Sequence, residues 1–115
     1  MVALSIDSLF DAAVRIQLEE RAVSVSFTEN TIRIKFPTTR RLAEFLDVPH
    51  YYVLPYFAMM EQEELVTRAE RVGIYTTVKG TRKMIAVMTA HYQTEIEGLI
   101  GKTIFQEILR KVETS

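Results

Sequence analysis

The sequence has no cysteine and no tryptophan, and it has only four glycines, three prolines and two histidines among 115 residues. Without cysteine the chain forms no disulfide bond and offers no thiolate to a metal ion or a substrate. It also lacks an apolar run of the about 18 residues that a membrane-spanning helix needs. These absences exclude a disulfide-stapled fold, a cysteine zinc site, a thiol enzyme and a transmembrane segment.

The remaining composition is that of an ordinary globular protein. Hydrophobic residues make up 48% of the chain and charged residues 25%, with no low-complexity tract. This length indicates one domain, residues 1–115, with a real core. The first residues lack the basic start and apolar run of a signal peptide, so we expect a cytoplasmic protein.

Charge is unevenly distributed along the chain, although the formal net charge is only −1. Residues 33–83 carry nine basic residues against six acidic ones, a balance of +3, whereas residues 1–32 carry two basic and five acidic residues. Affinity for nucleic acid comes largely from Lys and Arg at phosphates, so the middle of the chain is the part suited to DNA. The same cations would also suit an ordinary solvated surface.

Residues 1–37 predict a helix followed by a hairpin. Over residues 5–21, apolar residues recur at helical spacing behind a capping Ser or Asp. Alternation with period two then predicts strands over residues 23–27 and 32–36, with residues 29–30 as the turn between them.

Residues 38–80 predict two more helices and a second hairpin. The Thr38 and Thr39 hydroxyls favour a helix from about Thr39 to Asp47. The next helix begins at Pro49, with a proline inside it, or at Pro55, with that proline in its first turn. The hairpin is predicted from two strand-like runs, residues 65–71 and 74–78.

Residues 81–115 carry an apolar stripe at helical spacing, interrupted near Gly98 and Gly101. The pattern predicts one long helix with a bend, or two helices. Because the stripe is longer than one small core needs, we expect it to form the interface of a homodimer. The alternative is that it packs back onto the N-terminal helix of the same chain.

The stretch from Arg41 to Gly80 resembles the winged helix-turn-helix transcriptional regulators of the small prokaryotic and archaeal type. Three segments follow one another at the family's spacing: Leu42–Val48, Glu61–Arg68 and Thr77–Gly80. The resemblance covers about forty residues. It implies an α+β winged-helix fold, to which this chain adds an N-terminal helix, an extra β-hairpin and a long C-terminal helix.

The resemblance also implies which residues contact DNA. In this family the second helix of the motif lies in the major groove, and basic residues of the wing, the hairpin that follows, reach the backbone. Val53, Phe57 and Met60 then face the core, and the outward positions are His50, Tyr51, Leu54 and Ala58. Arg40 and Arg41 start the supporting helix, whereas Arg68, Arg71 and Lys79 fall on the wing strands. The implied DNA contacts are Arg40, Arg41, His50, Tyr51, Tyr52, Arg68, Arg71 and Lys79.

Three departures from the family pattern bear on DNA recognition. Asp47 and Glu64 stand where the family commonly has glycine, and the implied recognition helix contains no Lys or Arg. Base edges are normally read by Arg, Lys, Asn or Gln. Here the readers are His50, Tyr51 and Tyr52, which favours weak or shape-dependent binding.

No other pattern in the sequence assembles an active site. Gly101-Lys102-Thr103 matches the end of a phosphate-binding loop, but Ile96 stands where that loop needs its first glycine. His50 and His91 are far apart in the sequence and have no cysteine to complete a metal site. We therefore expect no catalytic activity, no metal and no cofactor.

The sequence thus predicts a cytoplasmic, homodimeric regulator of transcription that binds double-stranded DNA. The alternative is a winged-helix module that binds a protein partner through the apolar outer face of its second motif helix.

Overall fold

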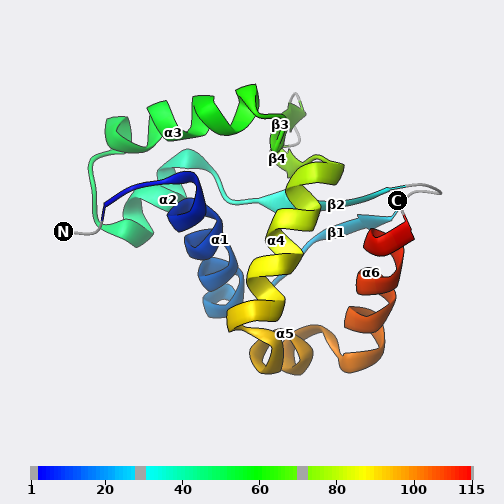
Figure 1. Cartoon of the computed structure of the whole chain (residues 1–115). Coiled ribbons are helices and arrows are strands. Elements are labelled where there is room, and N and C mark those ends of the chain that lie inside the picture. Colours follow the sequence, from blue (N-terminus) through cyan, green and yellow to red (C-terminus); the bar gives the residue numbers. More distant parts are fainter. Residues whose placement is uncertain (1–2, 28–30, 70–72, 115) are drawn as a thin grey trace.

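The computed structural model describes residues 3–27, 31–69 and 73–114. Over these ranges the chain forms six helices and a four-stranded antiparallel sheet (Figure 1), which confirms the predicted α+β class. The helices are α1 (Ile6–Glu20), α2 (Thr39–Leu46), α3 (His50–Gln62), α4 (Val78–His91), α5 (Gln93–Ile100) and α6 (Lys102–Thr114). The strands are β1 (Val25–Phe27), β2 (Ile32–Phe36), β3 (Val66–Ala69) and β4 (Gly73–Thr76).

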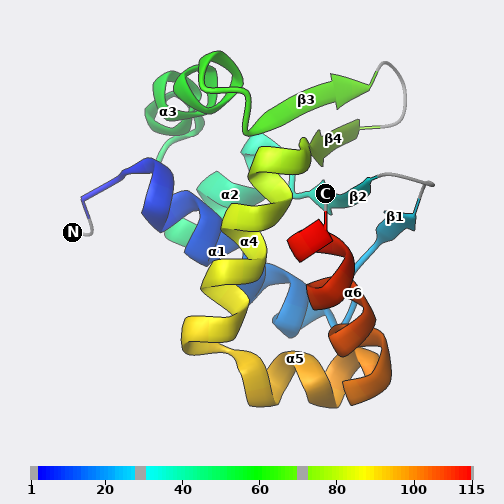
Figure 2. The ribbon, with the colours of Figure 1, turned by 45° about the vertical axis from the view of Figure 1, so that its right-hand side comes forward.

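Helix α1 begins at the predicted cap. The Ser8 N–H donates to Ser5 Oγ at 3.0 Å and the Ser5 N–H donates to Ser8 Oγ at 2.8 Å, which satisfies two backbone donors at the helix start. The apolar face of α1 is buried. Figures 1 and 2 both show α1 and α4 side by side, with α3 crossing near their upper ends.

The strands pair in the order β1-β2-β4-β3. The predicted first hairpin is confirmed, and its second strand also pairs with β4, where Lys35 lies opposite Tyr75. The two predicted hairpins therefore form one sheet. On β2, Ile32, Ile34 and Phe36 are buried while Arg33 and Lys35 are exposed, as period-two alternation requires. The predicted turn at residues 29–30 lies outside the described residues.

Helices α2 and α3 are joined by a short turn. The Thr38 hydroxyl accepts the Arg41 N–H at 3.1 Å and caps α2, as predicted. Asp47 ends α2 with φ 55°, a left-handed conformation that aspartate tolerates better than most residues. Pro49 then precedes the first residue of α3, and Pro55 lies inside the helix. Of the two predicted starts, the one at Pro49 is therefore right.

The second hairpin ends earlier than predicted. Strand β4 stops at Thr76, because the Thr77 hydroxyl accepts the Gly80 N–H at 3.0 Å and starts α4 there. The prediction of a strand to residue 78 was wrong, and so was the implied position of Lys79 on a wing strand. Lys79 lies in the first turn of α4, so the unit predicted to end at residue 80 includes the start of the next helix.

Gly80 allows α4 to approach the end of α3 closely. A Cβ atom on Gly80 would lie 1.8 Å from the backbone oxygen of Leu65, far inside van der Waals contact. One residue further along, the Thr81 hydroxyl donates to the Ile32 carbonyl at 2.6 Å. The start of α4 is thus packed against both the α3–β3 junction and β2.

The predicted long C-terminal helix is wrong, since the segment forms three helices. The chain breaks at Tyr92 and again at Gly101, where φ is 90°. The apolar stripe folds back on the same chain and is buried in the common core through Met84, Ile85, Met88, Ile96, Phe105 and Ile108. This packing is the predicted alternative to a dimer interface. The homodimer stays a prediction, without the exposed stripe that motivated it.

Tyr92 fastens the end of α4 to α1. Its hydroxyl donates to an Asp11 carboxylate oxygen at 2.7 Å. Burial and this hydrogen bond, which favours the protonated phenol, raise the pKa of Tyr92 to about 12.

Two glycine substitutions should separate close approach from helix propensity. Gly80→Ala should lower the free energy of unfolding by about 3 kcal/mol or more, because the new methyl group meets a backbone oxygen that cannot move independently. Gly98→Ala, inside α5 with open space around its Cβ position, should raise it by up to about 1 kcal/mol. Urea denaturation measures both. Equal effects would contradict the close approach at Gly80.

Candidate nucleic-acid interface

Helix α3 exposes several large apolar side chains. Four of its large hydrophobic side chains are at least 40% exposed, with Tyr51 at 66%: Tyr51, Tyr52, Leu54 and Met59. Its inward positions, Val53, Phe57 and Met60, are buried as the family resemblance implied. The helix is therefore held to the core by one narrow side, and the rest of its surface faces outward.

Each residue turns the helix by about 100°, so the outward residues of α3 divide into two flanks, one on each side of the buried positions. The first, called here the α2 flank, carries His50, Leu54 and Glu61 and faces Thr39 and Arg68. The second, called the α1 flank, faces the start of α1. It carries Tyr52, Tyr56, Met59 and Glu63.

The start of α2 joins the α2 flank. His50 Nε2 and Thr39 Oγ1 lie 2.7 Å apart in a hydrogen bond that fixes the imidazole beside the first turn of α2. Arg40 is exposed and borders the same small hollow as His50. Two acidic residues, Glu44 and Asp47, border it as well. This end of the α2 flank therefore has the Arg40 guanidinium and the His50 imidazole close to two carboxylates.

Arg68 lies at the other end of the α2 flank. Its guanidinium stands 4.7 Å from the centre of the buried Phe57 ring, and its Nε lies 3.5 Å from a carboxylate oxygen of Glu61. Stacking on the ring orients the guanidinium, while the ion pair is exposed and therefore weak. Arg68 lies on β3, the first strand of the predicted second hairpin. Arg71 lies outside the described residues.

Arg41 points away from α3. Its Nε donates to a Glu20 carboxylate oxygen at 2.8 Å, and a second carboxylate, Glu19, lies 3.9 Å from its Nη2. The hydrogen bond to Glu20 raises the pKa of Arg41. A phosphate would have to displace Glu20 to reach this guanidinium. The sequence could not reveal this, because the two partners are 21 residues apart.

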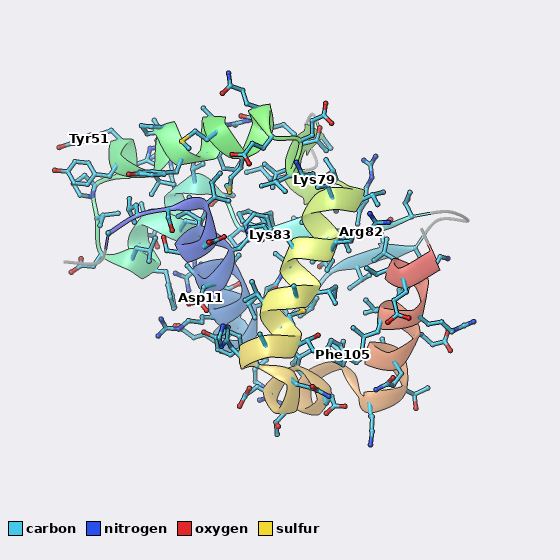
Figure 3. The ribbon with its side chains drawn as sticks, in the orientation of Figure 1. Asp11, Tyr51, Lys79, Arg82, Lys83 and Phe105 are labelled. Carbon is cyan, nitrogen blue, oxygen red and sulfur yellow. The ribbon has the colours of Figure 1, made fainter. Side chains whose placement is uncertain are left out.

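Lys79 also lies apart from the α2 flank. Its Nζ donates to the Glu63 carbonyl at 3.0 Å, at the end of α3 opposite Tyr51 (Figure 3). The Thr77 hydroxyl donates to the next carbonyl, that of Glu64. These bonds satisfy backbone acceptors that the end of a helix leaves unpaired. Lys79 therefore stabilises the α3–α4 junction.

Of the eight predicted contacts, Tyr51 has its ring centre 4.8 Å from that of Tyr52 and lines the same hollow as Tyr52. The structure brings Arg40 and His50 together at one end of the α2 flank and places Arg68 at the other. It places Tyr52 on the α1 flank, Arg41 against α1 and Lys79 on α4. Sequence reasoning missed the α1 flank itself. The spacing of Tyr52, Tyr56 and Met59, at intervals of four and three, is a signal that could have found it.

Comparison of the chain with models of known protein families, with curated proteins and with solved structures found no match. Among the described residues, no group of His, Asp and Glu side chains could hold a metal ion. Over the same ranges, no helix is both long and apolar enough to cross a membrane.

The turn after α3 generates a stability prediction. Glu64 has φ 60°, a conformation that costs a residue other than glycine about 1–2 kcal/mol. Glycine avoids this cost, but its greater conformational entropy in the unfolded chain destabilises the folded state by about 0.5–1 kcal/mol. Glu64→Gly should therefore raise the free energy of unfolding by about 0.5–1 kcal/mol. Its neighbour Glu63, with φ −82°, is the matched control, and Glu63→Gly should lower it. Chemical denaturation that ranks the two variants the other way would refute the left-handed turn.

Proposed function

We propose that this chain is a cytoplasmic winged helix-turn-helix protein that regulates transcription by binding duplex DNA with α3. The observation that carries the proposal is the arrangement of α2, α3 and the β3–β4 hairpin, together with β2, which pairs with the hairpin. This is the order of elements that the sequence resemblance implies. Much of the outer side of α3 is exposed, as a helix that enters a groove must be.

The positions of two arginines support docking of α3 in the major groove. Arg40 lies beside His50 at the start of the helix, and Arg68 lies beside Glu61 near its end. Eleven residues separate these two positions on α3, a rise of about 16 Å. The major groove is about 12 Å wide, so a helix that lies obliquely across the groove places one guanidinium near the phosphates of each strand.

The chemistry of α3 assigns affinity and specificity to different residues. Phosphate contacts fix the position of a protein on DNA, and base contacts give sequence preference. Because α3 has no Lys or Arg, affinity rests on Arg40 and Arg68. Preference rests on His50 and Tyr51, with Leu54 available to contact thymine methyl groups.

The salt dependence of binding tests the phosphate contacts. Each neutralised phosphate contributes about −0.9 to the slope of log affinity against log salt. Arg40→Ala and Arg68→Ala should each flatten that slope by about one unit, and Glu61→Gln, which frees Arg68 from its ion pair, should strengthen binding. Fluorescence anisotropy with random duplex DNA at several salt concentrations measures this.

The matched control for those variants is Arg41→Ala. Its guanidinium is already bound by Glu20, so the slope should stay that of the unmodified protein. A slope that falls equally with Arg40→Ala and Arg41→Ala would show general charge attraction in place of docking through α3.

Tyr51→Phe tests base contact separately. Tyr51 is the most exposed of the large hydrophobic side chains on α3, and its hydroxyl is the only group that the substitution removes. Preference between competing duplexes should weaken while the salt slope stays unchanged. Competition binding with duplexes selected from a random pool gives this preference directly. An unchanged ranking of the duplexes would remove Tyr51 from the base contacts.

A second candidate function is favoured by the same surface. Tyr51, Leu54 and Met59 are exposed on a helix without a cation, and carboxylates of Glu44, Asp47 and Glu61 lie around it. Such a surface suits an apolar protein partner better than a polyanion. Absence of duplex binding at low salt, in a protein that is folded by circular dichroism, would favour this protein-docking role.

A further inference from the structure

A cavity on the α1 flank of α3 is not used by the proposed DNA contacts. It lies between the start of α1, the second half of α3 and the first turns of α4, where Figure 3 shows Lys79 and Lys83. Its volume is about 560 Å³, within the range of about 300–1,000 Å³ usual for small-molecule sites. Its apolar wall consists of Leu4, Ile6, Tyr56, Met59 and Leu65.

The apolar wall continues beyond this cavity along α3. A second cavity of about 430 Å³ adjoins it and shares Leu4 and Tyr56 with it. Its other lining side chains are also uncharged, and they include Tyr51, Tyr52 and Pro55. The two cavities together form an apolar groove that follows the α1 flank and ends at the lysines of α4.

Lys79 gives the groove a cation that is not neutralised by a carboxylate. Its Nζ donates to a backbone carbonyl, which is a neutral acceptor. Across the described residues, no carboxylate lies within 4.0 Å of that nitrogen in an ion pair. An ammonium group has three donors, so two remain for a bound molecule.

The other charges near this end of the groove are accounted for. Lys83 Nζ lies 2.5 Å from an Asp7 carboxylate oxygen, so that pair is internally neutralised. The Glu63 side chain also borders the cavity and carries the one negative charge that opposes an anion there. A ligand that suits this arrangement has a single negative charge at one end and an apolar body.

We propose that the groove binds a small monocarboxylate with an apolar body, such as a fatty acid of medium length. The carboxylate accepts a charge-assisted hydrogen bond from Lys79 Nζ, and the apolar body covers Met59, which is 44% exposed without it, and Tyr56. The proposal rests on the lining of the groove and on Lys79, not on DNA binding. The end of the groove at Lys79 lies away from His50 and Arg68, whereas Tyr51, a proposed base contact, lines its far end.

Methionine-methyl NMR with octanoate tests the proposal on the intact chain. The Met59 methyl resonance should shift saturably with added octanoate, while those of Met84 and Met88, buried in the core, should stay in place. Octanol and octylamine have the same apolar body without the negative charge, so their affinity should be at least about tenfold lower. Equal shifts with octylamine, or the absence of a saturable Met59 shift with octanoate, would overturn the proposal.

Three variants identify the cation. Lys79→Gln keeps an N–H donor for the Glu63 carbonyl but removes the charge, and should weaken octanoate binding at least about tenfold. Glu63→Gln removes the opposing charge and should tighten binding. Lys102→Gln, at the exposed start of α6, is the control and should change nothing.

Two outcomes of these variant measurements would contradict the proposed site. An unchanged affinity in folded Lys79→Gln protein contradicts the assignment of the carboxylate to Lys79. Should that variant not fold, Glu63→Gln decides alone, because an affinity for octanoate equal to that of the unmodified protein would refute an anion at this end of the groove.

Discussion

The contact between Gly80 and the backbone of Leu65 is the constraint on which the rest of the structure depends. It brings the first turn of α4 against the end of α3, where Lys79 satisfies the carbonyl of Glu63. From the same turn, Thr81 bonds to β2. One close approach therefore fixes α3, the sheet and α4 relative to one another. Any side chain at residue 80 would separate all three, since its Cβ atom would lie 1.8 Å from the backbone oxygen of Leu65.

The buried side of helix α3 is fixed to the core, and its two outward flanks differ in chemistry. The α2 flank has arginines at its two ends and suits an extended polyanion, whereas the α1 flank is an apolar groove closed by lysines and suits a small amphiphile. The division follows from helical geometry, since residues three and four apart share a side and residues two apart do not. Tyr51 borders both surfaces, so a ligand that fills the groove as far as Tyr51 competes with DNA for that side chain, whereas Arg40, His50 and Arg68 stay accessible.

Local chemistry allowed much of the fold to be predicted from the sequence. Caps at Ser5 and Thr38 were found because a hydroxyl at a helix start acts within three residues. The errors came from interactions that residue patterns do not show. The strand-like pattern of residues continues through residue 78, but the Thr77 hydroxyl accepts the Gly80 N–H and caps α4. The partner of Arg41 was hidden for a different reason, since Glu20 is distant in the sequence. The helix break at Tyr92 could not be predicted, because no glycine or proline stands there.

The proline inside α3 has a consequence for recognition that its side chains do not reveal. Pro55 has no N–H, so the carbonyl of Tyr51 cannot receive the hydrogen bond that residue 55 would otherwise donate. Pro55 and Tyr51 are both exposed, and they lie on the same side of the helix. A proline ring also crowds the carbonyl four residues before it, which bends a helix at that point. The direction of the first turn of α3, which carries Tyr51 and Tyr52, relative to the rest of the helix is therefore set by Pro55.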